Sequence, residues 1–205
     1  MTAENNTDSF HPAETEPIVA DIVNVNEHGI KGINYYWSRK DKFNITEAEL
    51  RECGVEGDFA YVKEELIEPL KAANNDLQEL GIGIMIKDGY RSPALYQLVK
   101  QKRYETDGKE NTDLTLNTET MPHASGYVVD VNLYNLETGE ELSLWDHKDW
   151  PDGAFVDFYR DKTDESSKKF QKLQDLLIQT MVDNGFELGS KNEFWHFGLR
   201  QTNDA

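Results

Sequence analysis

Two short segments of this chain carry side chains that could together bind a divalent metal ion. They are His123-x-x-Gly126-x-x-x-Asp130 and, much later in the chain, Glu193-x-x-His196. Two imidazoles and one carboxylate form a donor set of the kind found in catalytic zinc sites, which leave a fourth position for water. Glu193 stands close to His196 in sequence and could take a proton from that water. The chemistry indicated is metal-assisted hydrolysis.

Each segment also has a simpler interpretation. Asp130 lies in the apolar run Val128–Val131, where a carboxylate needs a cationic partner, and an arginine would serve as well as a metal. Glu193 and His196 could be an edge-strand carboxylate and a core histidine among aromatic neighbours. The donor set suits zinc but would also admit cobalt or manganese.

Three further residues could carry chemistry. Arg91, in Asp88-Gly89-Tyr90-Arg91, could pair with Asp88 or bind a carbonyl oxygen that becomes an oxyanion. His147 is a second candidate ligand, but its polar surroundings predict an exposed side chain. Cys53 has no histidine nearby in the sequence, which favours a small semi-buried residue over a nucleophile.

The apolar pattern predicts the elements that must position these groups. Residues 1–17 are polar and acidic and are expected to form a flexible tail, followed by a single domain over residues 18–205. Helical spacing predicts a helix from Phe59 to Leu80, kinked or restarted at Pro69. In the first half of the domain we also expect strands at 18–25 and 82–86, and helices around 45–52 and from Pro93 to about Tyr104.

The second half begins with an expected loop at 105–120. We then expect a buried strand at 128–134, a turn at 136–140 and a return strand near 142–144. A long loop at 146–164 precedes a helix over 170–181 that Asn184-Gly185 ends, and strands at 186–188 and 194–199 complete the sheet. These elements do not alternate as βαβ units, so we predict an α+β fold with a mainly antiparallel central sheet and the zinc site on it.

Composition narrows the class of partner. The formal net charge is −18, with no basic stripe, which argues against nucleic acid as a partner. No apolar run reaches the ~20 residues that a membrane span needs. The N-terminal residues lack the basic and apolar regions of a signal peptide, so a cytoplasmic protein is expected.

Taken in order, Asp88-Gly89-Tyr90-Arg91, His123-x-x-Gly126-x-x-x-Asp130 and Glu193-x-x-His196 resemble the motifs of the zinc D-alanyl-D-alanine metallopeptidases. Leu133–Glu140 and Asn184–Glu187 are similar to the branch of D-Ala-D-Ala dipeptidases of the vancomycin-resistance type. The resemblance extends from about Ile18 to Arg200.

The resemblance implies a role for each motif. It implies that His123, Asp130 and His196 bind one zinc ion, that Glu193 is the catalytic base and that Arg91 stabilises the transition state. It further implies a small peptide substrate such as D-Ala-D-Ala. Asp157 would bind the substrate's ammonium group, and Tyr35 or Tyr36 would border the same end.

Two positions depart from the family pattern. Met121 stands where the family has a serine, and Val128 where it has an alanine. Met121 cannot donate a hydrogen bond to a substrate, so the exact substrate stays open. The alternatives are a D,D-carboxypeptidase or peptidoglycan endopeptidase with the same zinc chemistry, and a zinc-binding module without catalysis.

Overall fold

The computed structural model describes residues 21–200. The expected tail at 1–17 lies outside this range, as do the first residues of the strand expected at 18–25. Within the range, the fold is α+β around a mixed sheet of five strands. Among the described residues, no helix is both long and apolar enough to span a membrane.

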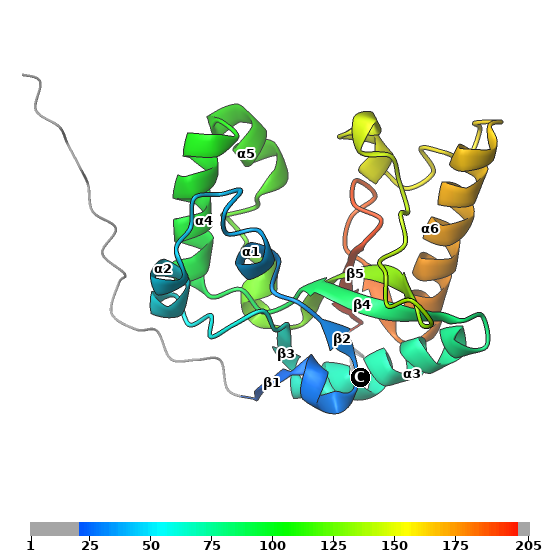
Figure 1. The fold of residues 1–205 in the computed structure, drawn as a ribbon, viewed down its shortest axis with the longest axis horizontal. Coiled ribbons are helices and arrows are strands. Elements are labelled where there is room, and N and C mark those ends of the chain that lie inside the picture. Colours follow the sequence, from blue (N-terminus) through cyan, green and yellow to red (C-terminus); the bar gives the residue numbers. More distant parts are fainter. Residues whose placement is uncertain (1–20, 201–205) are drawn as a thin grey trace, which may run out of the picture.

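The central sheet has the strand order β2-β4-β5-β7-β6 (Figure 1). Its strands are β2 (Lys31–Gly32), β4 (Ile82–Asp88), β5 (Val128–Asn135), β7 (His196–Leu199) and β6 (Phe186–Leu188). Only the short β2 runs parallel to its neighbour, and the other three pairings are antiparallel. The mainly antiparallel sheet expected from the sequence is therefore confirmed.

One face of the sheet is closed by two helices, α3 (Ile67–Gln78) and α6 (Glu165–Asp183), which also pack on each other. Alternate side chains of β5 (Val129, Val131 and Leu133) point into this main core and are fully buried. Because successive side chains of a strand point to opposite faces, Asp130 and Asn132 project from the other face.

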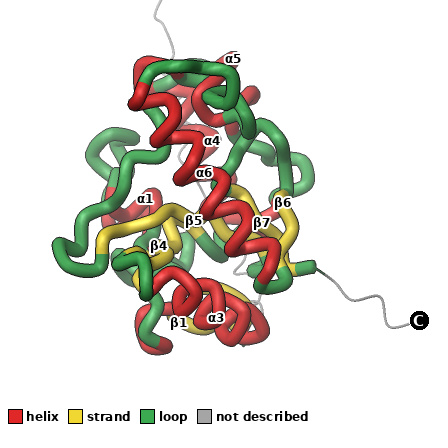
Figure 2. The backbone as a smooth tube through the Cα atoms, turned by 90° about the vertical axis from the view of Figure 1, so that its right-hand side faces the viewer, coloured by secondary structure: helices red, strands yellow, loops and turns green. Residues whose placement is uncertain are grey.

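A second group of helices stands above that other face (Figures 1 and 2). It consists of α1 (Tyr35–Ser38), α2 (Glu47–Glu52), α4 (Pro93–Thr106) and α5 (Lys109–Thr115). Apolar residues of these helices and of the turn between α1 and α2 form a separate core that includes Tyr36, Phe43 and Tyr96. Across from them rise the upper part of α6 and a segment with two short 3-10 helices, η4 (His147–Asp149) and η5 (Asp152–Ala154).

The helix predicted from Phe59 to Leu80 is wrong in its first part. Residues 61–63 form β3 (Tyr61–Lys63), which pairs with β1 (Ile22–Asn24) in a small antiparallel sheet. Ala60 and Val62 are buried in alternation, as a strand requires, while Phe59 is exposed. After the 3-10 turn η2 (Glu64–Leu66), α3 begins at Ile67, so Pro69 falls in its first turn, where proline removes no internal hydrogen bond.

The loop predicted at 105–120 contains a helix, α5. This helix has no apolar stripe, and polar contacts hold it in place instead. Arg103 and Tyr104 of α4 donate hydrogen bonds to Thr115 and Asp113, at 2.7 Å each. Thr112, which is buried, donates to the Gly108 carbonyl at 2.9 Å. Hydrophobic periodicity does not detect a helix fixed in this way.

The remaining expectations differ from the structure mostly at element ends. Ser92 caps α4, with Pro93 in its first turn, and α6 ends at Asn184-Gly185, where Gly185 has a φ of 90°. The turn after β5 forms as expected, with the Asn135 side chain accepting from two backbone N–H groups. The return strand reduces to one bridge, between Glu141 and Tyr134, because the chain then leaves the sheet.

Candidate metal centre

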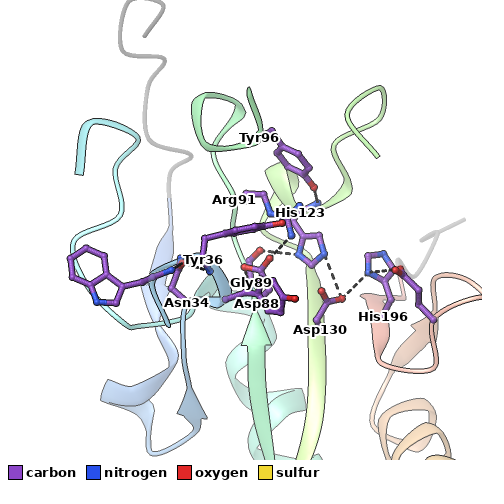
Figure 3. A network of polar contacts seen from close by, with 12 residues as sticks. Asn34, Tyr36, Asp88, Gly89, Arg91, Tyr96, His123, Asp130 and His196 are labelled. Carbon is purple, nitrogen blue, oxygen red and sulfur yellow. Dashed lines mark hydrogen bonds and ion pairs between the residues drawn. The ribbon is translucent and has the colours of Figure 1, made fainter. Parts of the chain in front are cut away.

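Three neighbouring strands bring the chemically active side chains of the sheet together. Asp130 of β5 pairs across the sheet with Asp88 of β4 on one side and with His196 of β7 on the other. The pairing of β4 with β5 shifts between Ile86 and Asp88, and this irregularity sets Asp88 directly opposite Asp130. Figure 3 shows Asp130 between the imidazoles of His123 and His196.

His123 reaches the same point from outside the sheet. It lies in the 3-10 helix η3 (Pro122–Ser125), which Gly126 ends in the left-handed conformation, with φ at 77°. This φ favours glycine, and a Cβ on Gly126 would also lie 2.6 Å from Cδ1 of Ile22, which would have to move. The His123 Nδ1 donates to the Gly89 carbonyl at 2.9 Å, and this bond turns Nε2 toward Asp130, whose Oδ1 lies 3.6 Å away.

The donor atoms fit a metal of zinc's size. One ligand atom each from His123, Asp130 and His196 lies within 4.8 Å of the others. For bonds of about 2 Å in a tetrahedral site, neighbouring donors lie roughly 3.4 Å apart. Asp130 Oδ1 lies 3.6 Å from His123 Nε2 and 2.9 Å from His196 Nδ1, which brackets that separation.

Electrostatics keep the carboxylate of this group ionised. Burial alone would raise the pKa of Asp130, but His123 and His196 outweigh it and hold that pKa well below the ordinary value. Burial would lower the pKa of His196, yet Asp130 and then Glu193 raise it. The protein thus concentrates negative charge where a cation would lie, and a metal ion would compete with the imidazole proton.

Glu193 borders the same centre without joining it. It lies in the turn before β7, with Oε2 4.0 Å from His196 Nδ1 and 34% of its side chain exposed. Burial raises the pKa of Glu193, and the charge of Asp130 adds to the rise. A carboxylate with a raised pKa, open to solvent and beside the donor atoms, is suited to accept and return a proton.

Arg91 lies on the side of His123 that faces away from His196 (Figure 3). It forms an ion pair with Asp88, and the two side chains are only 8% and 2% exposed. The rings of Tyr36 and Tyr96 pack against the guanidinium, with centroids 5.0 and 4.5 Å from its carbon. Its Nε is buried without a hydrogen-bond partner, which leaves one donor of the group uncommitted.

The other residues singled out from sequence are placed less centrally. Asp157 lies in the segment beyond η5, has a φ of 71° and pairs with Arg160, both side chains being more than half exposed. Tyr35 is part of the aromatic group around Tyr36. His147 is exposed, as expected, and Met121 packs against the second core.

Sequence reasoning missed several groups that shape this centre. Tyr96 accepts a hydrogen bond from the His123 backbone N–H at 3.0 Å, although its position on α4 reads only as core. The Gly89 carbonyl accepts a hydrogen bond from His123. Gly89 also lies so close to Tyr61 that a Cβ would be 2.3 Å from the Tyr61 backbone carbonyl oxygen. Gly189 lies against the His196 ring, where a Cβ would come within 2.5 Å. Glycines in a turn give no sign of such contacts.

Comparison with known proteins gives several solved structures with a similar fold, and two of them are peptidases. No family model and no curated protein matches the sequence. A Zn(II)-bound mutant of the vancomycin-resistance D,D-pentapeptidase VanY, from a VanB-type cassette, aligns over 69% of this chain and 74% of its own, with 15% identity and a TM-score of 0.46. The LD-carboxypeptidase LdcB, whose structure reveals the molecular basis of its peptidoglycan recognition, aligns over 92% of this chain and 71% of its own. The identity is 14% and the TM-score is 0.47.

Proposed function

We propose that this protein is a zinc metallopeptidase that hydrolyses the peptide bond of D-Ala-D-Ala or of a similar short dipeptide. The observation that carries the proposal is the convergence of five side chains from distant parts of the chain. His123, Asp130 and His196 form the donor set, with Glu193 on one side and Arg91 on the other. A purely structural metal site needs neither of the last two.

His123, Asp130 and His196 would hold the metal. A zinc ion held there would supply a water molecule with a pKa near 7 and a Lewis acid for a carbonyl oxygen. The hydrogen bond from His123 Nδ1 to the Gly89 carbonyl fixes the tautomer and the ring orientation needed for Nε2 to bind. Asp130 is held ionised by its two imidazole neighbours, so it meets the requirement for a ligand at neutral pH.

Glu193 would act as the general base and then as the general acid. Its carboxylate borders the donor set but does not bridge to Asp130, so it is free to take a proton from the attacking water. The same group would deliver this proton to the leaving amine, because its raised pKa favours the protonated form between the two transfers.

Arg91 would stabilise the negative charge that develops on the carbonyl oxygen. Asp88 and the two tyrosine rings fix the guanidinium, so little reorganisation accompanies the reaction. Removing one donor of this kind commonly lowers kcat by about 100- to 1000-fold.

Asp157 and Tyr35 are proposed to contact the substrate. Asp157 would bind the ammonium group of the dipeptide, and to do so it must exchange its bond to Arg160 for one to the substrate. Because that ion pair is exposed, its loss has little effect on stability. Tyr35 would line the site beside Tyr36.

The substrate assignment is tested with zinc-loaded protein and two peptides, D-Ala-D-Ala and a peptidoglycan stem peptide that ends in D-Ala-D-Ala. D-Alanine release from the dipeptide, with slower or no release from the stem peptide, supports the proposal. Cleavage of the stem peptide alone would reassign the protein as a carboxypeptidase or endopeptidase. Zinc binding without turnover of either peptide would favour the remaining alternative, a zinc-binding module without catalysis.

A further inference from the structure

The proposed substrate has a feature for which the metal centre offers no partner. A dipeptide carries a free carboxylate on its leaving residue, and an acidic protein must provide a local cation to bind it. Arg91 is not available for this, because it is paired with Asp88 and its one uncommitted donor, Nε, is assigned to the carbonyl oxygen. Met121 has no N–H or O–H group to donate in its side chain. A cation from another element is needed.

Arg39 differs from the other arginines between residues 21 and 200. It follows α1 directly, and its side chain makes no hydrogen bond or ion pair with the protein in the described part of the chain. The others are all bonded: Arg51 to Glu47, Arg91 to Asp88, Arg103 to Asp107, Arg160 to Asp157 and Asp175, and Arg200 to the Phe186 carbonyl. The N–H groups of Arg39 are therefore free to bind a ligand.

Tyr35 holds this guanidinium in a fixed place. The guanidinium carbon of Arg39 lies 4.2 Å from the centroid of the Tyr35 ring, within the range of a cation–π interaction. Tyr35 in turn contacts Tyr36 edge to face, with centroids 5.2 Å apart. Asn34 caps α1 and accepts from the backbone N–H groups of Tyr36 and Trp37, which fixes the whole aromatic group.

The same aromatic group connects Arg39 with the metal centre. The ring of Tyr36 packs on Arg91, which is bonded to Asp88 beside the donor set. Burial raises the pKa of Tyr35, Arg39 opposes the rise, and the charges of Asp88 and Asp130 add to it. The Tyr35 hydroxyl is thus within electrostatic range of both Arg39 and the metal-ligating Asp130.

In the described part of the chain no carboxylate bonds to Arg39. The charge of Arg39 lowers the pKa of Glu141, so this carboxylate is within electrostatic range, but Glu141 is bonded to Lys87 and Asn132. Lys40, the next residue, pairs with Glu47 and is not free in the same way. Among these neighbouring cations, Arg39 has both a fixed position and guanidinium N–H groups that make no bond within the described residues.

We propose that Arg39, stacked on Tyr35, binds the free carboxylate of the substrate's leaving residue. The planar guanidinium matches a carboxylate with two parallel hydrogen bonds, which selects both charge and orientation. The assignment rests on the proposed function and narrows it to peptides with a free C-terminus next to the cleaved bond. It also places Tyr35 at the carboxyl end of the substrate rather than at the amino end, because a guanidinium repels an ammonium group.

The test compares D-Ala-D-Ala with its C-terminal amide, using zinc-loaded wild type and Arg39→Gln. For the free acid we expect KM to rise by roughly 10- to 100-fold in the variant, the size of a lost charged hydrogen bond, with kcat nearly unchanged. For the amide we expect similar KM values in both proteins. An equal change in KM for the acid and the amide, or no change in KM for the acid, would overturn the proposal.

Arg51→Gln is the matched control. Arg51 also packs on an aromatic ring, with its guanidinium carbon 5.3 Å from the Trp37 centroid, but it pairs with Glu47 on the surface of α2. We expect this variant to keep the wild-type KM for both peptides. A loss equal to that of Arg39→Gln would mean that general surface charge is responsible, and the proposal would fail.

A binding measurement separates this proposal from the proposed function. The affinity of D-Ala-D-Ala is measured by calorimetry for zinc-loaded Glu193→Gln, with and without Arg39→Gln. Weaker binding in the double variant supports the role of Arg39 even if wild type shows no turnover, and in that case only the catalytic assignment is lost. Equal binding in the two proteins, or none in either, contradicts the role of Arg39.

Discussion

At the scale of single residues, the site depends on charges that are held in pairs. Asp130 lies between two imidazoles, and Arg91 and Asp88 neutralise each other in near-complete burial. An isolated charge in such a place would be strongly destabilising, whereas a bonded pair is tolerated. The two pairs lie next to each other because Asp88 and Asp130 are cross-strand partners.

Replacing Asp88 by asparagine tests the buried pair. Asp88→Asn leaves the Arg91 charge without compensation, so we expect the free energy of unfolding to fall by about 3 to 5 kcal/mol. Urea denaturation measures this. Asp157→Asn is the control, since it breaks an ion pair of the same spacing whose side chains are 54% and 52% exposed, and we expect a loss below about 1 kcal/mol. Equal losses in the two variants would contradict the account.

Glu141 gives a prediction for the dependence of stability on pH. Burial alone would raise its pKa from 4.5, but hydrogen bonds from Lys87 and Asn132 outweigh burial and lower it. A carboxylate whose pKa is lowered by folding stabilises the protein at any pH above the pKa that it has in the unfolded chain. This stabilisation is lost as the pH falls through the lower pKa of the folded state. Wild type should therefore exceed Glu141→Gln in stability at pH 6, and the difference should shrink as the pH falls below 4.5. A constant difference from pH 3 to pH 7 would be evidence against the Lys87 pairing.

At the scale of elements, the sequence predicts most strands, and the three residues of the candidate metal site that come together, better than it predicts how that site is supported. β4, β5, α4 and α6 follow from apolar periodicity and from capping residues, because burial and hydrogen bonding impose those patterns locally. β3 and α5 do not, since pairing with β1 and polar side-chain contacts decide them. Close approaches of glycine and the stacking of Arg39 on Tyr35 depend on tertiary structure and leave no signal in one sequence.

The turn between β6 and β7 gives a sharp test at this scale. A Cβ on Gly189 would lie 2.5 Å from Cδ2 of His196, so Gly189→Ala must displace the imidazole. We expect zinc affinity to fall by about 10- to 100-fold, the usual effect of disturbing a ligand's support. Gly198→Ala in β7 is the control, because its Cβ would meet only Val128 at 4.0 Å. Competition with a zinc chelator measures both, and equal affinities would show that the turn is not a support for His196.

At the scale of the whole molecule, the site joins two cores. Asp130 and His196 project from strands whose opposite face packs in the main core. Arg91 lies against Tyr36 and Tyr96 of the second core. His123 lies between them, bonded both to Gly89 and to Tyr96. A ligand that binds these groups only in the folded protein must therefore stabilise the entire fold.

Zinc should raise the midpoint of thermal unfolding. At free zinc about 1000-fold above its Kd, binding contributes about 4 kcal/mol, which corresponds to a shift of roughly 10 °C for a domain of this size. Differential scanning calorimetry with zinc and with a chelator measures the shift. His123→Ala should show almost none, and an undiminished shift in that variant would place the zinc elsewhere.

The first experiment is to measure D-alanine release from D-Ala-D-Ala by wild type and by Glu193→Gln, with the zinc content of both proteins determined. We expect one zinc per chain in each protein, release of D-alanine by wild type, and loss of nearly all activity in the variant. Full activity in zinc-loaded Glu193→Gln would contradict the assigned base. Absence of release by fully zinc-loaded wild type would contradict the dipeptidase itself.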